Sequence, residues 1–265
     1  MRNEIINHIS KENPWRDKIQ FFETITSTND VLKRMALQGA PEGTVLVADS
    51  QSGGRGRLGR TFLSPSGVGI YLSVLLRPAC MPGELMHLTC GSALAACNAI
   101  EQTAGFRPGV KWTNDIVYRK KKLAGILTEL GLNQDGSTAY AIIGIGINCT
   151  QKPEDFPPEL REIAGSLKMV SGREIDRALV AAKMIEGFYE MNRGLLQKKS
   201  QMISDYRKDC ITLGQEISVV RNGFNRHGKA LDVDEDGALL VAYEDGSMET
   251  VNSGEVSVRG LYNYV

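Results

Sequence analysis

Apolar residues recur with two different periods in the first 150 positions of the chain, and the two kinds of segment alternate. Stretches of β-branched and apolar residues predict buried strands, and stretches with a period near 3.6 predict helices. The predicted strands cover 44–48, 69–78, 110–118, 122–130 and 139–149. The last is apolar on both alternations, as is typical of a central strand. The sequence therefore predicts a sheet flanked by helices.

Local signals mark where the helices begin and end. One helix is predicted to begin at Ser27, which stands at capping-box spacing from Asp30. A second is predicted over 82–104, because this stretch is rich in Ala and Leu, and Gly105 ends it. Apolar spacing predicts further helix over about 176–206, after a proline-containing loop.

The sequence pattern changes after Gly214, where short apolar segments alternate with predicted turns. Turn pairs of the hairpin type separate these segments. The pairs are Asn222-Gly223, Asp236-Gly237 and Asp245-Gly246. We predict two domains, a larger one over 1–212 and a small all-β domain over 213–265.

Composition narrows the class of protein. With 265 residues and 42% hydrophobic content, the chain can bury a sizeable core. Lys and Arg together number 31, as do Asp and Glu, so the net charge supports neither nucleic-acid binding nor attachment to a membrane surface. The five cysteines contain no CxxC pair and predict free thiols in a reducing compartment. The polar N-terminus lacks a signal peptide, and we expect a cytoplasmic protein.

The strongest chemical feature is the loop SGGRGRLGR at 52–60, in which four glycines alternate with three arginines. Glycines allow the backbone to approach an anion closely, and guanidinium groups suit carboxylate and phosphate. No Gly-Lys-Ser/Thr follows, so the loop is not a Walker P-loop. A flexible solvated loop is the alternative interpretation of this stretch alone.

Three further clusters follow along the chain. KWTND at 111–115 combines a lysine, an amide and a carboxylate, and Lys122 stands at the mouth of an apolar strand. Gly144 and Gly146 interrupt the predicted central strand, where missing side chains often mark the approach of a ligand or another backbone. A bulge or tight helix packing explains these glycines equally well. The scattered histidines and cysteines have no zinc-type spacing.

These clusters, in this order, closely resemble the motifs of biotin protein ligases. The matching segments are STN at 27–29, QSGGRGRLGR at 51–60, KWTND at 111–115, KLAGILTE at 122–129 and GIGIN at 144–148. The resemblance covers roughly 22–150 and implies an α+β fold. It implies a mixed sheet flanked by helices, similar to class II aminoacyl-tRNA synthetases, followed by a small C-terminal SH3-like β-barrel.

The resemblance also implies roles for individual residues. Biotin would contact Ser27, Thr28, Asn29, Gln51, Arg55, Gly56, Arg57 and Lys122. ATP would contact Arg60, Phe62, Lys111, Asn114, Asp115 and Asn148, and its Mg²⁺ would use Asp115 as a protein contact. The catalytic groups would be Lys122, Arg57 and Lys111.

The implied reaction is the activation of biotin by ATP to biotinyl-AMP, followed by transfer to a lysine of a biotin carboxyl carrier protein. Two anions must meet in the first step, and the arginines and lysines can cancel their repulsion. The sequence departs from the family pattern at Thr113, where proline is common, and at Phe62, where tryptophan often stands. The family often pairs through edge strands, so a homodimer is compatible with the resemblance.

Three other functions compete with this one. Lipoate ligases use a related fold and a similar lysine, but the STN segment and the RGRxGR loop favour biotin. A biotin-sensing repressor needs a winged helix before the catalytic domain, and the segment before residue 22 is too short for one. A non-catalytic biotin-binding module would have no need of Lys122 together with the nucleotide-side residues.

Overall fold

A mixed seven-stranded sheet forms the centre of the larger domain in this computed structural model, which describes residues 1–221, 224–252 and 255–258. The strand order is β1-β2-β3-β7-β6-β5-β4, with β1 and β2 parallel and the other neighbours antiparallel. The bounds are β1 Ile19–Ile25, β2 Val45–Gln51, β3 Gly69–Leu76, β4 Gly109–Lys111, β5 Asp115–Tyr118, β6 Lys121–Leu132 and β7 Thr138–Asn148. The prediction that 139–149 forms a central strand is confirmed.

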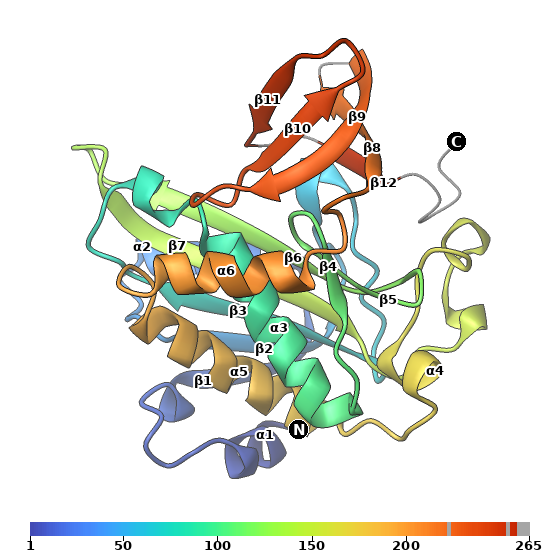
Figure 1. Cartoon of the computed structure of the whole chain (residues 1–265). Helices are drawn as coiled ribbons and strands as arrows, with labels where there is room; N and C mark the ends of the chain where they lie inside the picture. The colour runs from blue at the N-terminus through green and yellow to red at the C-terminus, as the bar shows by residue number, and fades with distance from the viewer. Residues whose placement is uncertain (222–223, 253–254, 259–265) are drawn as a thin grey trace.

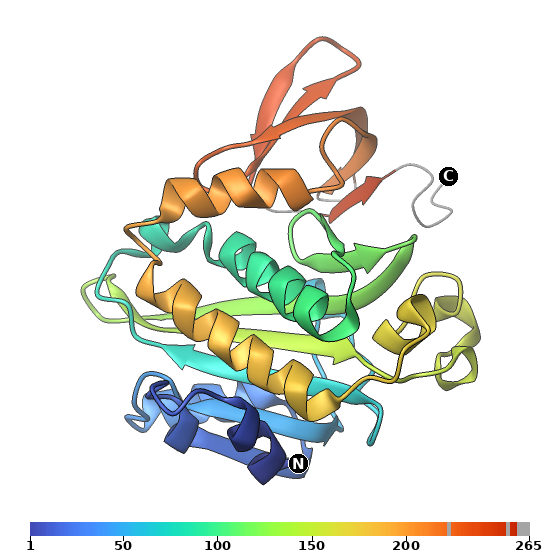
Figure 2. The same cartoon turned by 60° about the horizontal axis from the view of Figure 1, so that its bottom comes forward.

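Helices cover both faces of this sheet (Figure 1). Along β2, Val45 and Val47 pack into the core beneath α3 and α5, whereas Leu46 packs into a second core beneath α2. This alternation follows from the period of two in a strand. Figure 2 shows α3, α5 and α6 on the face turned to the viewer. The bounds are α1 Arg2–His8, α2 Thr28–Leu37, α3 Leu88–Ala104, α4 Leu167–Ser171, α5 Arg177–Arg193 and α6 Lys199–Asp209.

Local capping signals were reliable. The Ser27 side chain accepts a hydrogen bond from the backbone N–H of Asp30, so the predicted start of α2 is confirmed. Gly105 adopts the left-handed conformation with φ of 76° and ends α3 as predicted. The N-terminal part of 82–104 differs, because Pro82–Leu85 forms a separate 3₁₀ turn before the helix.

Two predicted elements are divided in the structure. The segment 110–118 is not one strand but an antiparallel hairpin, in which β4 turns at 112–114 and returns as β5. The segment is long and apolar enough for a single strand. The turn is specified by contacts with residues that are distant in sequence. The predicted helix over 176–206 is two helices, because α5 ends at Gly194 and α6 begins at Lys199.

The C-terminal domain is an antiparallel sheet of five strands in the order β11-β10-β9-β8-β12. The bounds are β8 Glu216–Arg221, β9 Phe224–Val233, β10 Leu239–Tyr243, β11 Met248–Val251 and β12 Glu255–Val258. No strand pair closes this sheet into a barrel within the described part of the chain. The turns Asp236-Gly237 and Asp245-Gly246 join strands as predicted, and Asn222-Gly223 lies outside the described residues.

The N-terminal segment is attached to the larger domain. In α1, Ile5 is fully buried, and the Ser10 N–H donates to Glu186 of α5. All five cysteines are free thiols. Among the described residues, none of the helices combines the length and apolar character that crossing a bilayer requires.

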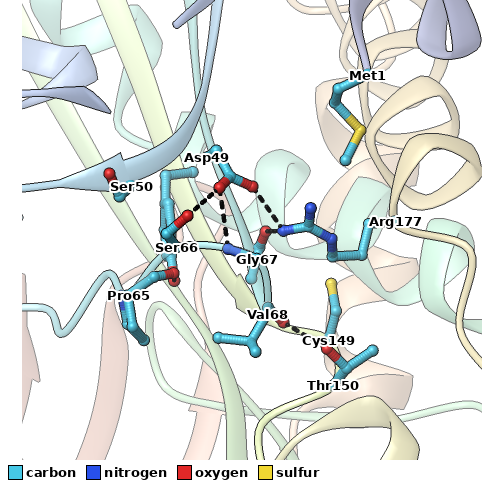
Figure 3. A network of polar contacts seen from close by, with 12 residues as sticks. Met1, Asp49, Ser50, Pro65, Ser66, Gly67, Val68, Cys149, Thr150 and Arg177 are labelled. Carbon is cyan, nitrogen blue, oxygen red and sulfur yellow. Dashed lines mark hydrogen bonds and ion pairs between the residues drawn. The ribbon is translucent and has the colours of Figure 1, made fainter. Parts of the chain in front are cut away.

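A polar network joins β2 to the beginning of α5 (Figure 3). The Asp49 carboxylate lies 2.9 Å from Arg177 Nη1 and accepts hydrogen bonds from the Ser66 hydroxyl and the Gly67 N–H. Arg177 also donates to the carbonyl of Gly69 at the start of β3. Burial by itself would raise the pKa of Asp49, but the bonds from Ser66 and Arg177 outweigh it and lower the pKa. The network anchors the segment that returns from the Gly/Arg loop.

Replacing Asp49 with Asn should destabilise the chain by about 1 to 2 kcal/mol at pH 7, because a charged acceptor is lost. The carboxylate contributes fully above its ordinary pKa of 3.8, and the contribution disappears as the pH falls through the lowered native pKa. Urea denaturation at pH 7 and in steps from pH 4 to pH 2 would measure how the stability difference between the two proteins shrinks as the Asp49 carboxylate is protonated. The exposed Glu12→Gln variant is the control, and a pH-independent difference would contradict the assignment to the carboxylate.

Candidate active site

One cavity of about 280 Å³ lies over the sheet, beneath the Gly/Arg loop. Every site residue that was predicted from the sequence lines this cavity. The fourteen are Ser27, Thr28, Asn29, Gln51, Arg55, Gly56, Arg57, Arg60, Phe62, Lys111, Asn114, Asp115, Lys122 and Asn148. The fold thus brings together motifs that are up to 121 positions apart, from Ser27 to Asn148.

Polar side chains at the N-terminus of α2 and on the neighbouring strands form one surface of the cavity, called the polar floor below. Its members are Ser27, Thr28, Asn29, Gln51 and Ser73. Gln51 Oε1 accepts the Thr28 N–H at 2.8 Å and lies 3.1 Å from the Thr28 hydroxyl. The Ser73 hydroxyl of β3 lies 2.7 Å from Thr28 Oγ1 and 2.6 Å from Asn29 Oδ1. Gln51 Nε2 in turn donates to the Ser64 hydroxyl. These bonds fix the side chains before any ligand arrives.

Two side chains occupy space that glycines of β7 leave empty. A Cβ on Gly144 would lie 2.0 Å from Asn29 Oδ1, and a Cβ on Gly146 would lie 2.3 Å from the Phe62 ring. The groups that approach these glycines are side chains of this chain, one of them from α2, so Gly144 corresponds to the alternative of tight helix packing. The Phe62 ring also meets Tyr71 edge to face, with the ring centroids 6.4 Å apart.

The Gly/Arg loop is an ordered hairpin and not a solvated coil. The Gly56 N–H donates to the Arg60 carbonyl at 2.7 Å, and the Phe62 N–H donates to the Gly54 carbonyl at 3.0 Å. At its tip Leu58 adopts a left-handed conformation and is 69% exposed. The hairpin rises over the cavity with an apolar side chain at its apex.

Arg55 ties this loop to two other elements. Its guanidinium pairs with Asp30 of α2 and lies 3.3 Å from Glu129 Oε1 of β6. Glu129 Oε2 accepts a hydrogen bond from Asn29 Nδ2 at 2.8 Å. The loop, the floor and the central sheet therefore share one network of polar contacts.

Lys122 and Asp115 form an ion pair inside the cavity, with Nζ 2.6 Å from Oδ1. Asp115 lies on β5 and Lys122 on the neighbouring strand β6, where their register partners are Gly125 and Val117. Arg57 reaches the same region from the loop and donates to Asn114 Oδ1 at 2.9 Å. Cationic groups from β6 and from the loop approach the same region, so an anion bound between them would replace carboxylate and amide partners.

The segment 156–164 closes one side of the cavity and is called the wall below, and no motif predicted it. The Lys122 N–H donates to the Ile163 carbonyl, and the Gly165 N–H donates to the Lys122 carbonyl. Asn148 Nδ2 holds the Gly165 carbonyl at 3.0 Å. The lining residues from this wall are Phe156, Leu160, Ile163 and Ala164.

Sequence reasoning also missed three residues outside the wall that complete the site. Ser73 and Glu129 hold the floor and the loop, and Trp112 lines the cavity between Lys111 and Asn114. Ser73 could have been suspected, because it is a polar residue in the otherwise apolar run of β3. In the part of the chain that the structure describes, no group of three or more His, Cys, Asp or Glu side chains could hold a metal ion.

Comparison with known families identifies two matching models. The model for the Biotin/lipoate A/B protein ligase family matches residues 21–148, and the model for the Biotin protein ligase C terminal domain matches residues 212–259. The first range contains all fourteen nominated residues.

Similar proteins and structures carry related names. The chain is 36% identical to the bifunctional ligase/repressor BirA of Bacillus subtilis, over 85% of this chain and 70% of that protein. It is 30% identical to a biotin--[acetyl-CoA-carboxylase] ligase of Mycobacterium tuberculosis, over 91% of this chain and 89% of that protein. A biotin protein ligase from Aquifex aeolicus, solved in complex with biotin and ATP, matches with a TM-score of 0.76 and 31% identity, covering 91% of this chain and 98% of that one.

Replacing Gly144 with Ala should destabilise the chain by about 1 to 3 kcal/mol, because the new methyl group overlaps the Asn29 amide. Thermal and urea denaturation would measure the loss. Gly83→Ala is the matched control, since a Cβ there meets no atom within 4 Å. Equal stability of the two variants would mean that Asn29 does not occupy this position.

Proposed function

The chain belongs to the biotin protein ligase family, and from this premise we propose that it activates biotin with ATP and transfers it to a lysine of a biotin carboxyl carrier protein. The observation that carries the proposal is the gathering of all fourteen nominated residues around one cavity. We assign catalysis to residues 1–212 and a supporting role to 213–265. The free thiols are consistent with a cytoplasmic location.

We assign the polar floor to the biotin side. Ser27, Thr28 and Asn29 would hold the ureido ring, with Gln51 fixing their orientation. Arg55, Gly56 and Arg57 would complete the pocket from the loop above. The floor's existing hydrogen bonds support this assignment, because a pre-organised polar surface binds a small ligand without losing further side-chain entropy.

We assign the opposite side of the cavity to ATP. Lys111, Asn114 and Asp115 flank the β4–β5 turn, and Arg60 and Phe62 approach from the loop. Asn148 would act on the nucleotide side through the backbone of the wall, since its amide already binds the Gly165 carbonyl. The apolar groups of the wall offer a surface for the base.

Mg²⁺ would arrive with the triphosphate and use Asp115 as a protein contact. The donor set fits this role, because a hard cation bound through phosphate oxygens needs only one or two carboxylates from the protein. When bound, the cation would neutralise charge on the triphosphate.

In the first step the biotin carboxylate attacks the α-phosphorus of ATP, and pyrophosphate leaves. Lys122, Arg57 and Lys111 would cancel the repulsion between the two anions and stabilise the charge that develops on the α-phosphate. Lys122 is suited to this task because its ammonium is already held beside Asp115 at the cavity wall. The product is biotinyl-AMP.

In the second step the neutral amine of the acceptor lysine attacks the acyl carbon of biotinyl-AMP, and AMP leaves. The Gly/Arg loop would shield the mixed anhydride from water until the acceptor arrives. The exposed Leu58 at the tip of the hairpin is consistent with a loop that packs against a partner group only when the site is filled.

Lipoate ligation and repression are the alternative functions. The matching family model includes lipoate ligases, so the acid that is activated must be tested directly. The B. subtilis relative is named both ligase and repressor. Residues 1–18 of this chain contain the short helix α1 and a 3₁₀ turn, and the Ser10 N–H after α1 donates to Glu186 of α5. Dimerisation through an edge strand stays a prediction.

Incubation of the purified chain with ATP, Mg²⁺ and either biotin or lipoate, followed by mass spectrometry, tests the proposal. Biotinyl-AMP should form and its biotin should move to an added carrier domain. Formation of lipoyl-AMP alone would show that the chain is a lipoate ligase. The absence of any adenylate would refute the proposed reaction.

Lys122→Ala should slow adenylate formation by about a hundredfold or more, because one positioned donor to the reacting anion is lost. Lys120→Ala, two positions away on the exposed turn, is the control and should retain full activity. Circular dichroism of both variants checks the fold. Full activity of Lys122→Ala would remove this lysine from the catalytic groups.

Arg57→Ala should accelerate the dissociation of biotinyl-AMP by about tenfold while changing biotin affinity little, because the loop loses its bond to Asn114. Stopped-flow release of biotinyl-AMP and calorimetry with biotin would measure the two effects. Arg34→Ala on the exposed face of α2 is the control. An equal loss of both affinities would indicate a defect of the pocket itself.

A further inference from the structure

Trp112 connects the cavity to the C-terminal domain. It follows Lys111 on the β4–β5 turn, lines the cavity and is only 4% exposed. Its indole Nε1–H donates to the carbonyl of Gly237 at 2.9 Å. Gly237 belongs to the turn between β9 and β10, so this buried bond spans 125 positions of sequence and joins the two domains.

The backbone of the same turn is held from the segment that leads into the C-terminal domain. The Trp112 N–H donates to the Thr212 hydroxyl at 2.9 Å, and the Tyr206 hydroxyl donates to the Thr113 carbonyl at 3.2 Å. The Ile211 N–H donates to the Val110 carbonyl. The conformation of residues 110–113 therefore depends on contacts that lie far away in sequence.

The β9–β10 turn is rigid enough to act as a fixed support. Asp234 Oδ1 accepts the N–H groups of Asp236 and Ala238, each at 2.9 Å. Asp236 pairs with Lys199 at the start of α6. Gly237 has φ of +86°, and a Cβ there would lie 2.8 Å from Cys90 Sγ of α3. The turn thus packs between α3, α6 and Trp112 of the cavity. Position 237 requires glycine, because a larger residue would overlap Cys90.

We propose that Trp112 is a positioning residue through which the β9–β10 turn of the C-terminal domain sets the nucleotide side of the cavity. A buried indole N–H needs a hydrogen-bond acceptor, so displacement of the Gly237 carbonyl leaves the donor unsatisfied. The turn that carries Lys111 and Asn114 would then shift. The inference deepens the proposed function, on which it rests, by giving the C-terminal domain a part in nucleotide binding.

A shift of the β4–β5 turn should leave the polar floor on the biotin side unchanged. Its floor is built by α2, β2 and β3, whose hydrogen bonds join Thr28, Gln51 and Ser73 to one another. These bonds do not involve the β4–β5 turn. A loss of the Trp112 bond therefore predicts weaker nucleotide binding with biotin binding preserved, and general unfolding of the cavity would weaken both.

The test uses the full chain with Trp112→Phe and Gly237→Ala, and calorimetric titration with α,β-methylene ATP and, separately, with biotin. The analogue cannot be cleaved at the bond broken during adenylation, so its affinity is measured without turnover. Each variant should bind the analogue about five- to tenfold more weakly, as expected for the loss of one buried hydrogen bond. Affinity for biotin should stay within twofold of that of the unmodified chain.

Two matched controls separate this effect from ordinary destabilisation. Trp15→Phe changes the other tryptophan of the chain, which is equally buried but packs against Tyr189 far from the cavity. Gly246→Ala introduces the same backbone strain at φ of +81° in the β10–β11 turn, where a Cβ meets no atom within 4 Å. Both controls should bind the analogue normally.

Unchanged analogue affinity in Trp112→Phe, or equal weakening of analogue and biotin, would overturn the inference. Weakening of analogue binding by either control would do so as well. The unmodified chain is assayed in parallel for biotinyl-AMP. If it forms none, the proposed reaction fails, and the analogue titrations still report whether the C-terminal turn controls the cavity.

Discussion

The absence of side chains at two positions of β7 is the constraint on which the rest of the site depends. Gly144 leaves room for the Asn29 amide, and Gly146 leaves room for the Phe62 ring. Since β7 is the central strand and is paired along its length with β3 and β6, its backbone cannot move aside to admit a larger residue. These two glycines therefore allow Asn29 of α2 and Phe62 of the Gly/Arg loop to pack directly against the sheet.

Paired charges dominate the chemistry of the cavity. Lys122 contacts Asp115, and Arg55 contacts Asp30 and Glu129. Such pairs keep cations at the cavity without leaving them unbalanced in a partly desolvated site. An incoming carboxylate or phosphate would replace a protein carboxylate beside such a cation, so the site can bring two substrate anions together by exchanging one ion pair for another.

The C-terminal domain is joined to the site by buried contacts and not by a simple linker. Trp112 reaches Gly237, and Arg207 of α6 reaches the carbonyl of Val233. The Trp112 bond to Gly237, together with the bonds of Thr212 and Tyr206 to the same turn, explains why 110–118 folds as a hairpin and not as the single strand that its composition favours. The preference of an apolar segment for a strand is weak compared with several specific tertiary hydrogen bonds.

The sequence by itself determined what depends on neighbouring residues. Ser27 and Gly105 act within one helical turn, so the start of α2 and the end of α3 were predictable, and the continuous apolar run of β7 predicted a central strand. The ordered motifs, through their resemblance to a known family, likewise identified fourteen of the residues that line the cavity. Tertiary structure alone decided the division of 110–118, the wall at 156–164 and the bond from Trp112 to Gly237. Each of these depends on groups distant in sequence whose proximity exists only after the chain has folded, because local periodicity carries no record of which segments will meet.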